Sequence, residues 1–250
     1  MTLTPRQEEV KAAFVAVHGG WDEGWQSILE LDPEFLGAYL GFEAVPARQQ
    51  HLDAKTRAFI GLTVDAATTH LHAPGIRHHI AAALAAGATR AEVMEVLECA
   101  ATLGIHAMNV GVPVLVEVLE EQGLRTAPAP LDAEQERIKA AFTRDRGYWN
   151  PTWDEMLELT PELFEAYTAF SSHPWLNGTL SPKLREFIYI AFDTSSTHLY
   201  RVGLKLHIEN ALGYGATPQE ILEVMEIASV IGIHSVTTGA PIRRELAPEG

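Results

Sequence analysis

The chain has 250 residues, of which 47% are hydrophobic, and its 33 acidic residues outnumber its 18 basic residues to give a formal net charge of −15. This composition supports a packed core and does not fit intrinsic disorder. The scarcity of Lys and Arg argues against binding to nucleic acid or to an anionic membrane, because such partners need many cations to neutralise their phosphates.

The N-terminal residues and the number of cysteines indicate the cellular compartment in which the protein is expected. The first residues lack the apolar segment of a signal peptide, and no apolar run is expected to approach the roughly 20 residues of a membrane span. The single cysteine, Cys99, cannot form an internal disulfide. We therefore expect a soluble cytoplasmic protein.

The sequence contains one module twice, at a constant spacing of 128 residues. The segment Thr-His-Leu-His-Ala-Pro-Gly at 69–75 returns as Thr-His-Leu-Tyr-Arg-Val-Gly at 197–203. This period is too long for a solenoid unit, whose periods are roughly 20 to 50 residues. Two homologous modules are therefore predicted, at residues 1–126 and 127–250, as a pseudo-twofold pair joined by a Pro-containing linker at 123–131.

Each module is predicted to start with a helix, at 11–17 and 134–142, followed by a Trp-containing segment. A further helix then begins with Pro at its first position, where the missing N–H costs nothing, after Asp32 or Thr160. The spacing of apolar residues predicts a buried helix next, over 55–69 and 183–197.

An Ala-rich helix over 75–86 is predicted to end at Gly87 in the left-handed conformation. The segments 89–92 and 217–220 match the capping-box pattern at the start of the following helix. Pro113 and Pro241 are predicted to open one last helix in each module. Because no alternating strand pattern appears, the predicted fold class is all-α, with two tandem homologous helical modules.

Histidines carry the main functional signal, because imidazole titrates near neutral pH and suits proton transfer. Three pairs recur at the repeat spacing: His70/His198, His79/His207 and His106/His234. Three histidines elsewhere lack a histidine partner at that spacing and are predicted to lie on the surface: His18, His51 and His173. The repeated pairs also fit a structural role, since a packing residue inherited by both modules would repeat as well.

Acidic residues of the capped helix offer partners for these histidines. Glu98 lies eight residues before His106, about two helical turns, so the two share a face. Glu95 equally fits a solvated helix face. Cys99 aligns with Ile227 of the second module and is predicted to be a buried core thiol.

Three segments of the first module carry a resemblance to a known family: His-Ile-Ala-Ala-Ala-Leu-Ala-Ala-Gly-Ala-Thr-Arg-Ala-Glu-Val at 79–93, Glu95-Val96-Leu97 and Gly104-Ile105-His106. Together they resemble the carboxymuconolactone decarboxylase and alkylhydroperoxidase D superfamily, and residues 207–224 repeat the pattern. The resemblance covers about 50 residues in the second half of each module. It implies an all-helical fold whose single-module members form trimers or hexamers. A tandem member is then expected to be a homo-oligomer, with a trimer favoured.

The peroxidase branch of that superfamily uses a Cys-x-x-Cys-x-x-x-His motif. Counted back from His79 and His207, its thiol positions hold His72 and Gly75, and Tyr200 and Gly203. Thiol peroxidase chemistry needs a thiolate and a resolving thiol, so this activity is not expected.

The decarboxylase branch places an acid four residues before the helix histidine, where this chain has glycine. An alignment from the preceding helix, with a two-residue insertion near Pro74, instead places Glu186 at the proton-relay glutamate of the family. The first module has Ala58 there. The resemblance therefore implies that the two modules differ, with one active and the other structural.

The first functional hypothesis is a cofactor-free acid/base enzyme, a decarboxylase, lyase or isomerase, on a small organic acid or lactone. Its candidate catalytic residues are His70, His79, His106, His198, His207, His234 and Glu186. Its candidate substrate-binding residues are Arg57, Arg185, His72 and Tyr200, although an Arg on this helix more often forms a structural ion pair.

Two alternatives stay open. A metal site is the first, because His70, His72, His79 and His106 supply imidazoles suited to zinc or iron. A non-catalytic module that binds a small molecule or supports assembly is the second.

Overall fold

The structure, a computed structural model, describes residues 3–18, 20–125 and 130–247. Within these ranges the chain is all-α, which confirms the predicted fold class, and no strand is found. The first module contains α1 (Pro5–His18), α2 (Glu23–Leu31), α3 (Pro33–Gln49), α4 (Ala54–Ala66), α5 (Ala73–Ala85), α6 (Arg90–Ala101) and α7 (His106–Glu121). The second contains α8 (Ala133–Arg146), α9 (Asp154–Leu159), α10 (Pro161–Asn177), α11 (Pro182–Thr194), α12 (Arg201–Gly213), α13 (Pro218–Ser229) and α14 (His234–Leu246).

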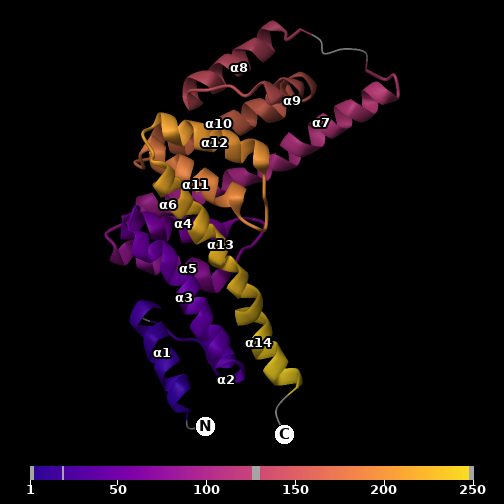
Figure 1. The fold of residues 1–250 in the computed structure, drawn as a ribbon. Coiled ribbons are helices and arrows are strands. Elements are labelled where there is room, and N and C mark those ends of the chain that lie inside the picture. Colours follow the sequence, from indigo (N-terminus) through magenta and orange to yellow (C-terminus); the bar gives the residue numbers. More distant parts are fainter. Residues whose placement is uncertain (1–2, 19, 126–129, 248–250) are drawn as a thin grey trace.

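The first helices of each module pack beside the last helix of the other module. Helices α1 and α2 lie at one end of the molecule beside α14, whereas α8 and α9 lie at the other end beside α7 (Figure 1). Phe14 and Leu29 pack in one cluster with Ile233, and Phe142 packs in another with Val112. The first helices of each module are therefore buried by the last helix of the other module.

The middle of the molecule is also shared. Helices α4 and α11, which are equivalent in the repeat, pack against each other and against both α6 and α13. One core cluster joins Phe59 and Cys99 to Ile188, and a second joins Ile60 to Val224. Neither module has a core of its own. Residues 126–129 of the predicted linker at 123–131, which contain the predicted boundary between the modules, lie outside the described residues.

A buried ion pair links the modules on each side of the pseudo-twofold axis. Glu95 of α6 is 3% exposed; its Oε1 lies 2.7 Å from Nη2 of Arg185 on α11, and Oε2 accepts a hydrogen bond from the N–H of Thr179 at 2.6 Å. The solvated position predicted for Glu95 is therefore wrong, because this carboxylate closes the contact between the two modules.

The equivalent glutamate, Glu223 of α13, accepts hydrogen bonds from the N–H groups of His51 and Leu52 and lies 3.8 Å from Nη1 of Arg57. Arg57 and Arg185 are thus held in structural ion pairs, the alternative that the sequence left open. We do not assign them to substrate binding, because their guanidinium groups are committed to these glutamates.

The local sequence signals for helix ends are largely realised. Both predicted capping boxes are present, at 89–92 and 217–220, and Gly87 has φ +88° after α5. The last helices, however, do not open at Pro113 and Pro241, which lie inside α7 and α14. A short 3₁₀ turn carries the chain from the preceding helix directly into them, so His106 and His234 occupy their first turns.

Two helical stretches, Arg90–Glu121 and Pro218–Leu246, are long and apolar enough for a membrane span by length and composition alone. The expectation that no stretch reaches that length is wrong by this measure. Both stretches contain a 3₁₀ turn and supply buried residues to the shared core, and core helices of this kind meet the same criterion.

Candidate metal centres between the modules

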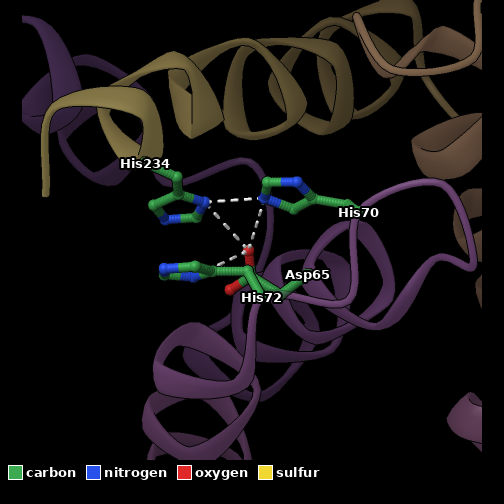
Figure 2. A group of neighbouring side chains, drawn as sticks. All are labelled: Asp65, His70, His72 and His234. Carbon is green, nitrogen blue, oxygen red and sulfur yellow. Dashed lines mark hydrogen bonds and ion pairs between the residues drawn. The ribbon is translucent and has the colours of Figure 1, made fainter. Parts of the chain in front are cut away.

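Four polar side chains meet where α4, α5 and α14 converge, and we call this group site 1: Asp65, His70, His72 and His234. Nε2 of His70 lies 2.8 Å from Nδ1 of His234 and 3.7 Å from Oδ1 of Asp65. Nδ1 of His234 lies 3.4 Å from the same carboxylate oxygen. Figure 2 shows the two rings and the carboxylate facing one another, with His234 reaching in from the last helix of the second module.

The repeat produces an equivalent group, site 2, from Asp193, His198 and His106. Nδ1 of His106 lies 2.7 Å from Nε2 of His198 and 3.6 Å from Oδ1 of Asp193. Nε2 of His198 lies 4.0 Å from that oxygen. Each site therefore takes its aspartate and one histidine from one module and its second histidine from the other.

The turn before α5 and α12 is strained in the same way in both modules. Leu71 has φ 49° and Leu199 has φ 51°, a left-handed conformation that is unusual for leucine, and both side chains are exposed. Such strain persists where the surrounding structure holds it, often at functional sites. The turn is held by backbone bonds from residues 72 and 200 to the carbonyls of Asp65 and Asp193.

The third ring differs between the sites. Nδ1 of His72 accepts a hydrogen bond from the N–H of Gly75 at 3.2 Å, which caps α5, and lies 3.8 Å from Asp65. In site 2, Tyr200 occupies the equivalent position, and its ring centroid lies 4.1 Å from that of His106. The set common to both sites is therefore two histidines and one aspartate.

This arrangement corrects the metal-ligand set expected from the sequence. His106 does not join His70, His72 and His79, because α7 carries it to the aspartate of the second module. The partner of the first-module set is instead His234.

Glycine lets each aspartate approach the helix that follows. A Cβ atom on Gly75 would lie 1.9 Å from Oδ2 of Asp65, and one on Gly203 would lie 2.3 Å from Oδ2 of Asp193. Any other residue at these positions would displace the carboxylate. This close approach, rather than a turn, explains why both modules have glycine there.

The two carboxylates are buried without a hydrogen-bond donor. Asp65 is 1% exposed and Asp193 is fully buried, and none of their four oxygens has a hydrogen-bond partner among the described residues. Burial raises the pKa of Asp65 to about 7 and that of Asp193, which also faces the charge of Glu186, to about 8. An unpaired buried carboxylate is costly, so each aspartate favours a state in which a bound proton or a metal cation neutralises it.

Burial acts on the histidines in the opposite direction. It lowers the pKa of His106 and of His234 to about 3, and it also lowers the pKa of His70 and His198. The rings are therefore neutral near pH 7, which is the form that binds a metal ion.

The ligand atoms of each site lie near the spacing of ligands to a single ion, with the two imidazoles closer together and the carboxylate farther away. Zinc-binding nitrogen and oxygen atoms lie about 2.0 to 2.2 Å from the metal, so two ligands of one ion are about 3 to 3.5 Å apart at tetrahedral or octahedral angles. The separations are 2.8, 3.4 and 3.7 Å in site 1 and 2.7, 3.6 and 4.0 Å in site 2. Two histidines and a carboxylate with open positions suit non-haem iron or catalytic zinc.

The remaining histidine pair distinguishes the two modules. Nδ1 of His207 lies 2.6 Å from Oε2 of Glu186, and the ring packs against Tyr189. In the first module Ala58 and Gly61 replace that acid and that tyrosine, and Nε2 of His79 instead lies 3.4 Å from Asp65. The structure thus places Glu186, the residue that the resemblance aligned with the family's proton-relay glutamate, against His207 of the same module.

A cavity adjoins site 2. Its volume is about 30 Å³, and its lining includes His106, His207, Arg146 and Tyr148. A volume of this size has room for roughly one or two water molecules, so a larger molecule enters only when the surrounding side chains move. The side chains of site 2 and the Glu186–His207 pair therefore reach one shared space through His106 and His207.

The unpaired histidines have separate surroundings. His51 and His173 are exposed, as predicted, but His18 is not a surface residue. Its Nε2 lies 2.8 Å from Oε2 of Glu43, and its ring stacks on Phe14.

Sequence reasoning missed the two aspartates and Arg146. Asp65 and Asp193 repeat at the spacing of 128 within otherwise apolar helix patterns, a signal that could have identified them. Arg146 has no such signal, because the first module has His18 at the equivalent position.

Comparisons with known proteins agree with this architecture. The model of the carboxymuconolactone decarboxylase family matches residues 33–117 and 161–236. The crystal structure of a candidate gamma-carboxymuconolactone decarboxylase subunit from Burkholderia xenovorans LB400 is 55% identical, covers 97% of both chains and superposes with a TM-score of 0.93. No curated protein gives a significant match. The matches to both halves show that the chain belongs to the carboxymuconolactone decarboxylase family.

Proposed function

We propose that this member of the family is an enzyme of the decarboxylase, lyase or isomerase type that acts on a small organic acid or lactone with a zinc or iron ion. The observation that carries the proposal is the double occurrence of two neutral histidines beside a buried aspartate without a hydrogen-bond donor. This favours the metal-assisted alternative over the cofactor-free one, because a cation compensates each buried carboxylate.

In this proposal, Asp193, His198 and His106 hold the ion of site 2, and Asp65, His70 and His234 hold that of site 1. Such an ion supplies a Lewis acid that polarises a carbonyl or carboxylate oxygen. Decarboxylation breaks a C–C bond and leaves the electron pair on the neighbouring carbonyl group, so positive charge at that oxygen lowers the barrier.

The proton that must then reach carbon is assigned to His207. Its Nδ1 donates to the Glu186 carboxylate, which fixes the ring tautomer and leaves Nε2 as the atom that exchanges a proton. Glu186 is fully buried and also accepts a bond from Asn210 at 3.3 Å. The pair therefore has the form of a histidine oriented by an acid, beside the cavity that His207 lines.

Thiol peroxidase chemistry is not part of the proposal. Cys99 is fully buried, and burial raises the pKa of its thiol to about 12. With no second cysteine in the sequence, the chain has neither a thiolate near neutral pH nor a resolving thiol.

The test begins with the metal content of the purified protein, measured by inductively coupled plasma mass spectrometry after loading with Zn²⁺ or Fe²⁺ and gel filtration. We expect two ions per chain, falling to one in Asp65→Asn and in Asp193→Asn. His51→Ala, which removes an exposed histidine outside both sites, is the matched control and should retain two.

Turnover is then measured as release of CO₂ from gamma-carboxymuconolactone and from a panel of small keto acids, with loaded and chelator-treated protein. Activity restored by metal supports the proposal. Equal activity after chelation would favour the cofactor-free alternative, and a protein that binds neither metal nor substrate would favour a non-catalytic module.

A homo-oligomer, with a trimer favoured, and a cytoplasmic location remain predictions. Support for association comes from the exposed apolar residues along α7: Val110, Val114, Leu115 and Val118. Light scattering of the purified protein measures the oligomeric state directly.

A further inference from the structure

The cavity beside site 2 contains a buried cation without an acidic partner. Arg146, the last residue of α8, is 4% exposed, and among the described residues no carboxylate forms an ion pair with its guanidinium. Its hydrogen bonds to the carbonyl of Ser171 and to the hydroxyl of Tyr148 are long, at 3.3 Å each. Its Nε has no partner within the described part of the chain.

Aromatic rings surround this guanidinium. The centroids of Trp175, Tyr189, Phe142 and Tyr148 lie 5.0 to 5.8 Å from its Cζ. These rings stabilise a cation and exclude water, but they do not satisfy its N–H donors. The nearby acid Glu186 is committed to His207 and Asn210. The guanidinium thus retains donors for an anionic ligand.

The first module does not repeat this arrangement. At the spacing of 128 residues, Arg146 is replaced by His18, and Ser171 is replaced by Glu43. His18 and Glu43 bond to each other at 2.8 Å, so the equivalent position near site 1 already contains a compensating carboxylate. In the second module that carboxylate is missing from the chain, and a ligand can provide it.

We propose that Arg146 is the receptor for the carboxylate of a small organic acid, and that only the cavity at site 2 binds this ligand. Guanidinium binds carboxylate through paired charge-assisted hydrogen bonds, and a dry aromatic surround strengthens them. The same cavity is lined by His106 of site 2 and by His207. An acid held by Arg146 is therefore placed beside the metal ligands and the proton-transfer pair.

This inference rests on the proposed function for its catalytic meaning, whereas binding of the carboxylate itself does not need the metal. The two modules then have different tasks: site 2 binds and converts the acid, and site 1 stabilises the interface between the modules. A substrate whose carboxylate is esterified is expected not to bind.

The experiment uses the intact protein and 4-oxopentanoate, a small keto acid, with its methyl ester as the neutral control, in titrations followed by calorimetry. We expect the acid to bind to wild-type protein and the ester not to bind. Arg146→Gln should weaken binding by about tenfold to a hundredfold, as expected for the loss of charge-assisted hydrogen bonds. His18→Gln, at the equivalent position of the first module, should bind like the wild type.

Because Arg146 is buried, Arg146→Lys provides a second variant that retains the charge, and circular dichroism checks that each variant is folded. Partial recovery of binding in the lysine variant is expected. Equal binding of acid and ester, unchanged binding in a folded Arg146→Gln protein, or loss of binding in His18→Gln would overturn the inference.

Repetition with chelator-treated protein separates this inference from the proposed function. Binding that persists without metal and depends on Arg146 supports the receptor, even if metal measurements contradict the metal-assisted function. Binding that disappears with the metal and survives in Arg146→Gln would assign the carboxylate to the ion and overturn the receptor, while leaving the metal-assisted function intact.

Discussion

His106 and His198 belong to different modules, yet their ring nitrogens lie 2.7 Å apart beside the buried carboxylate of Asp193. His106 is the first residue of α7, and the equivalent His234, the first residue of α14, reaches site 1 in the same way. The duplication has therefore produced two sites that each need both halves of the chain.

Because each site takes one histidine from the other module, replacing that histidine should remove the metal ion from the site in the opposite module. His106→Ala should remove one ion per chain from site 2, and His234→Ala should remove one from site 1, although each residue lies in the opposite module. The metal content of His106→Ala combined with Asp193→Asn checks this. The pair should lose one ion in total, since both ligands serve one site; loss of two would contradict the assignment.

The close approach of glycine to the aspartates predicts a steric effect. Gly203→Ala should weaken metal binding at site 2 by about tenfold or more, because the added Cβ displaces Asp193 from its ligand position. Gly213→Ala on the same helix meets nothing within 4 Å and should bind metal normally. Competition with a chelating dye measures both affinities.

The ion pair between the modules predicts a loss of stability. Glu95→Ala should reduce the free energy of unfolding by about 3 kcal/mol or more, because it leaves the guanidinium of Arg185 buried and unpaired. Glu98→Ala, on the same helix but without a side-chain hydrogen bond among the described residues, should change it by about 0.5 kcal/mol or less. Urea denaturation provides the comparison, and equal effects would contradict the role of Glu95.

The buried thiol predicts low reactivity and an alkaline dependence. Cys99 should not react with a thiol reagent at pH 8 in the folded protein and should react fully in denaturant. Because burial raises its pKa to about 12, the unfolded chain loses this proton first, from about pH 9, and stability falls as the pH rises between these values. Cys99→Val should lose less stability than the wild type from pH 9 to pH 11.

The asymmetry of the modules predicts unequal effects on turnover. If Arg146 positions the substrate at site 2, Asp193→Asn should reduce kcat by about a hundredfold or more through loss of the Lewis acid. Asp65→Asn should retain most of the activity, provided that denaturation shows it to be folded. Equal loss in the two variants would show that both sites convert substrate.

Local structure could be predicted from the sequence alone. Capping residues and Gly87 fixed helix ends through backbone hydrogen bonds within a few residues, and the repeat of 128 residues indicated two related modules. Pro113 and Pro241 gave the wrong start for the last helices, because a proline inside a helix is tolerated where packing holds the surrounding turns. The pattern identified the paired histidines, but it did not assign them to common sites.

Which residues meet depended on tertiary packing. The partners His106 and Asp193 are 87 positions apart in the chain, and contacts at that separation follow from how α6, which leads to His106, packs on α11 rather than from any local pattern. The same holds for Arg146. Its guanidinium keeps unpaired N–H donors because no carboxylate among the described residues pairs with it. Burial sets whether an aspartate or a histidine is charged, and packing sets whether a charged arginine has an acidic partner; both are properties of the assembled helices.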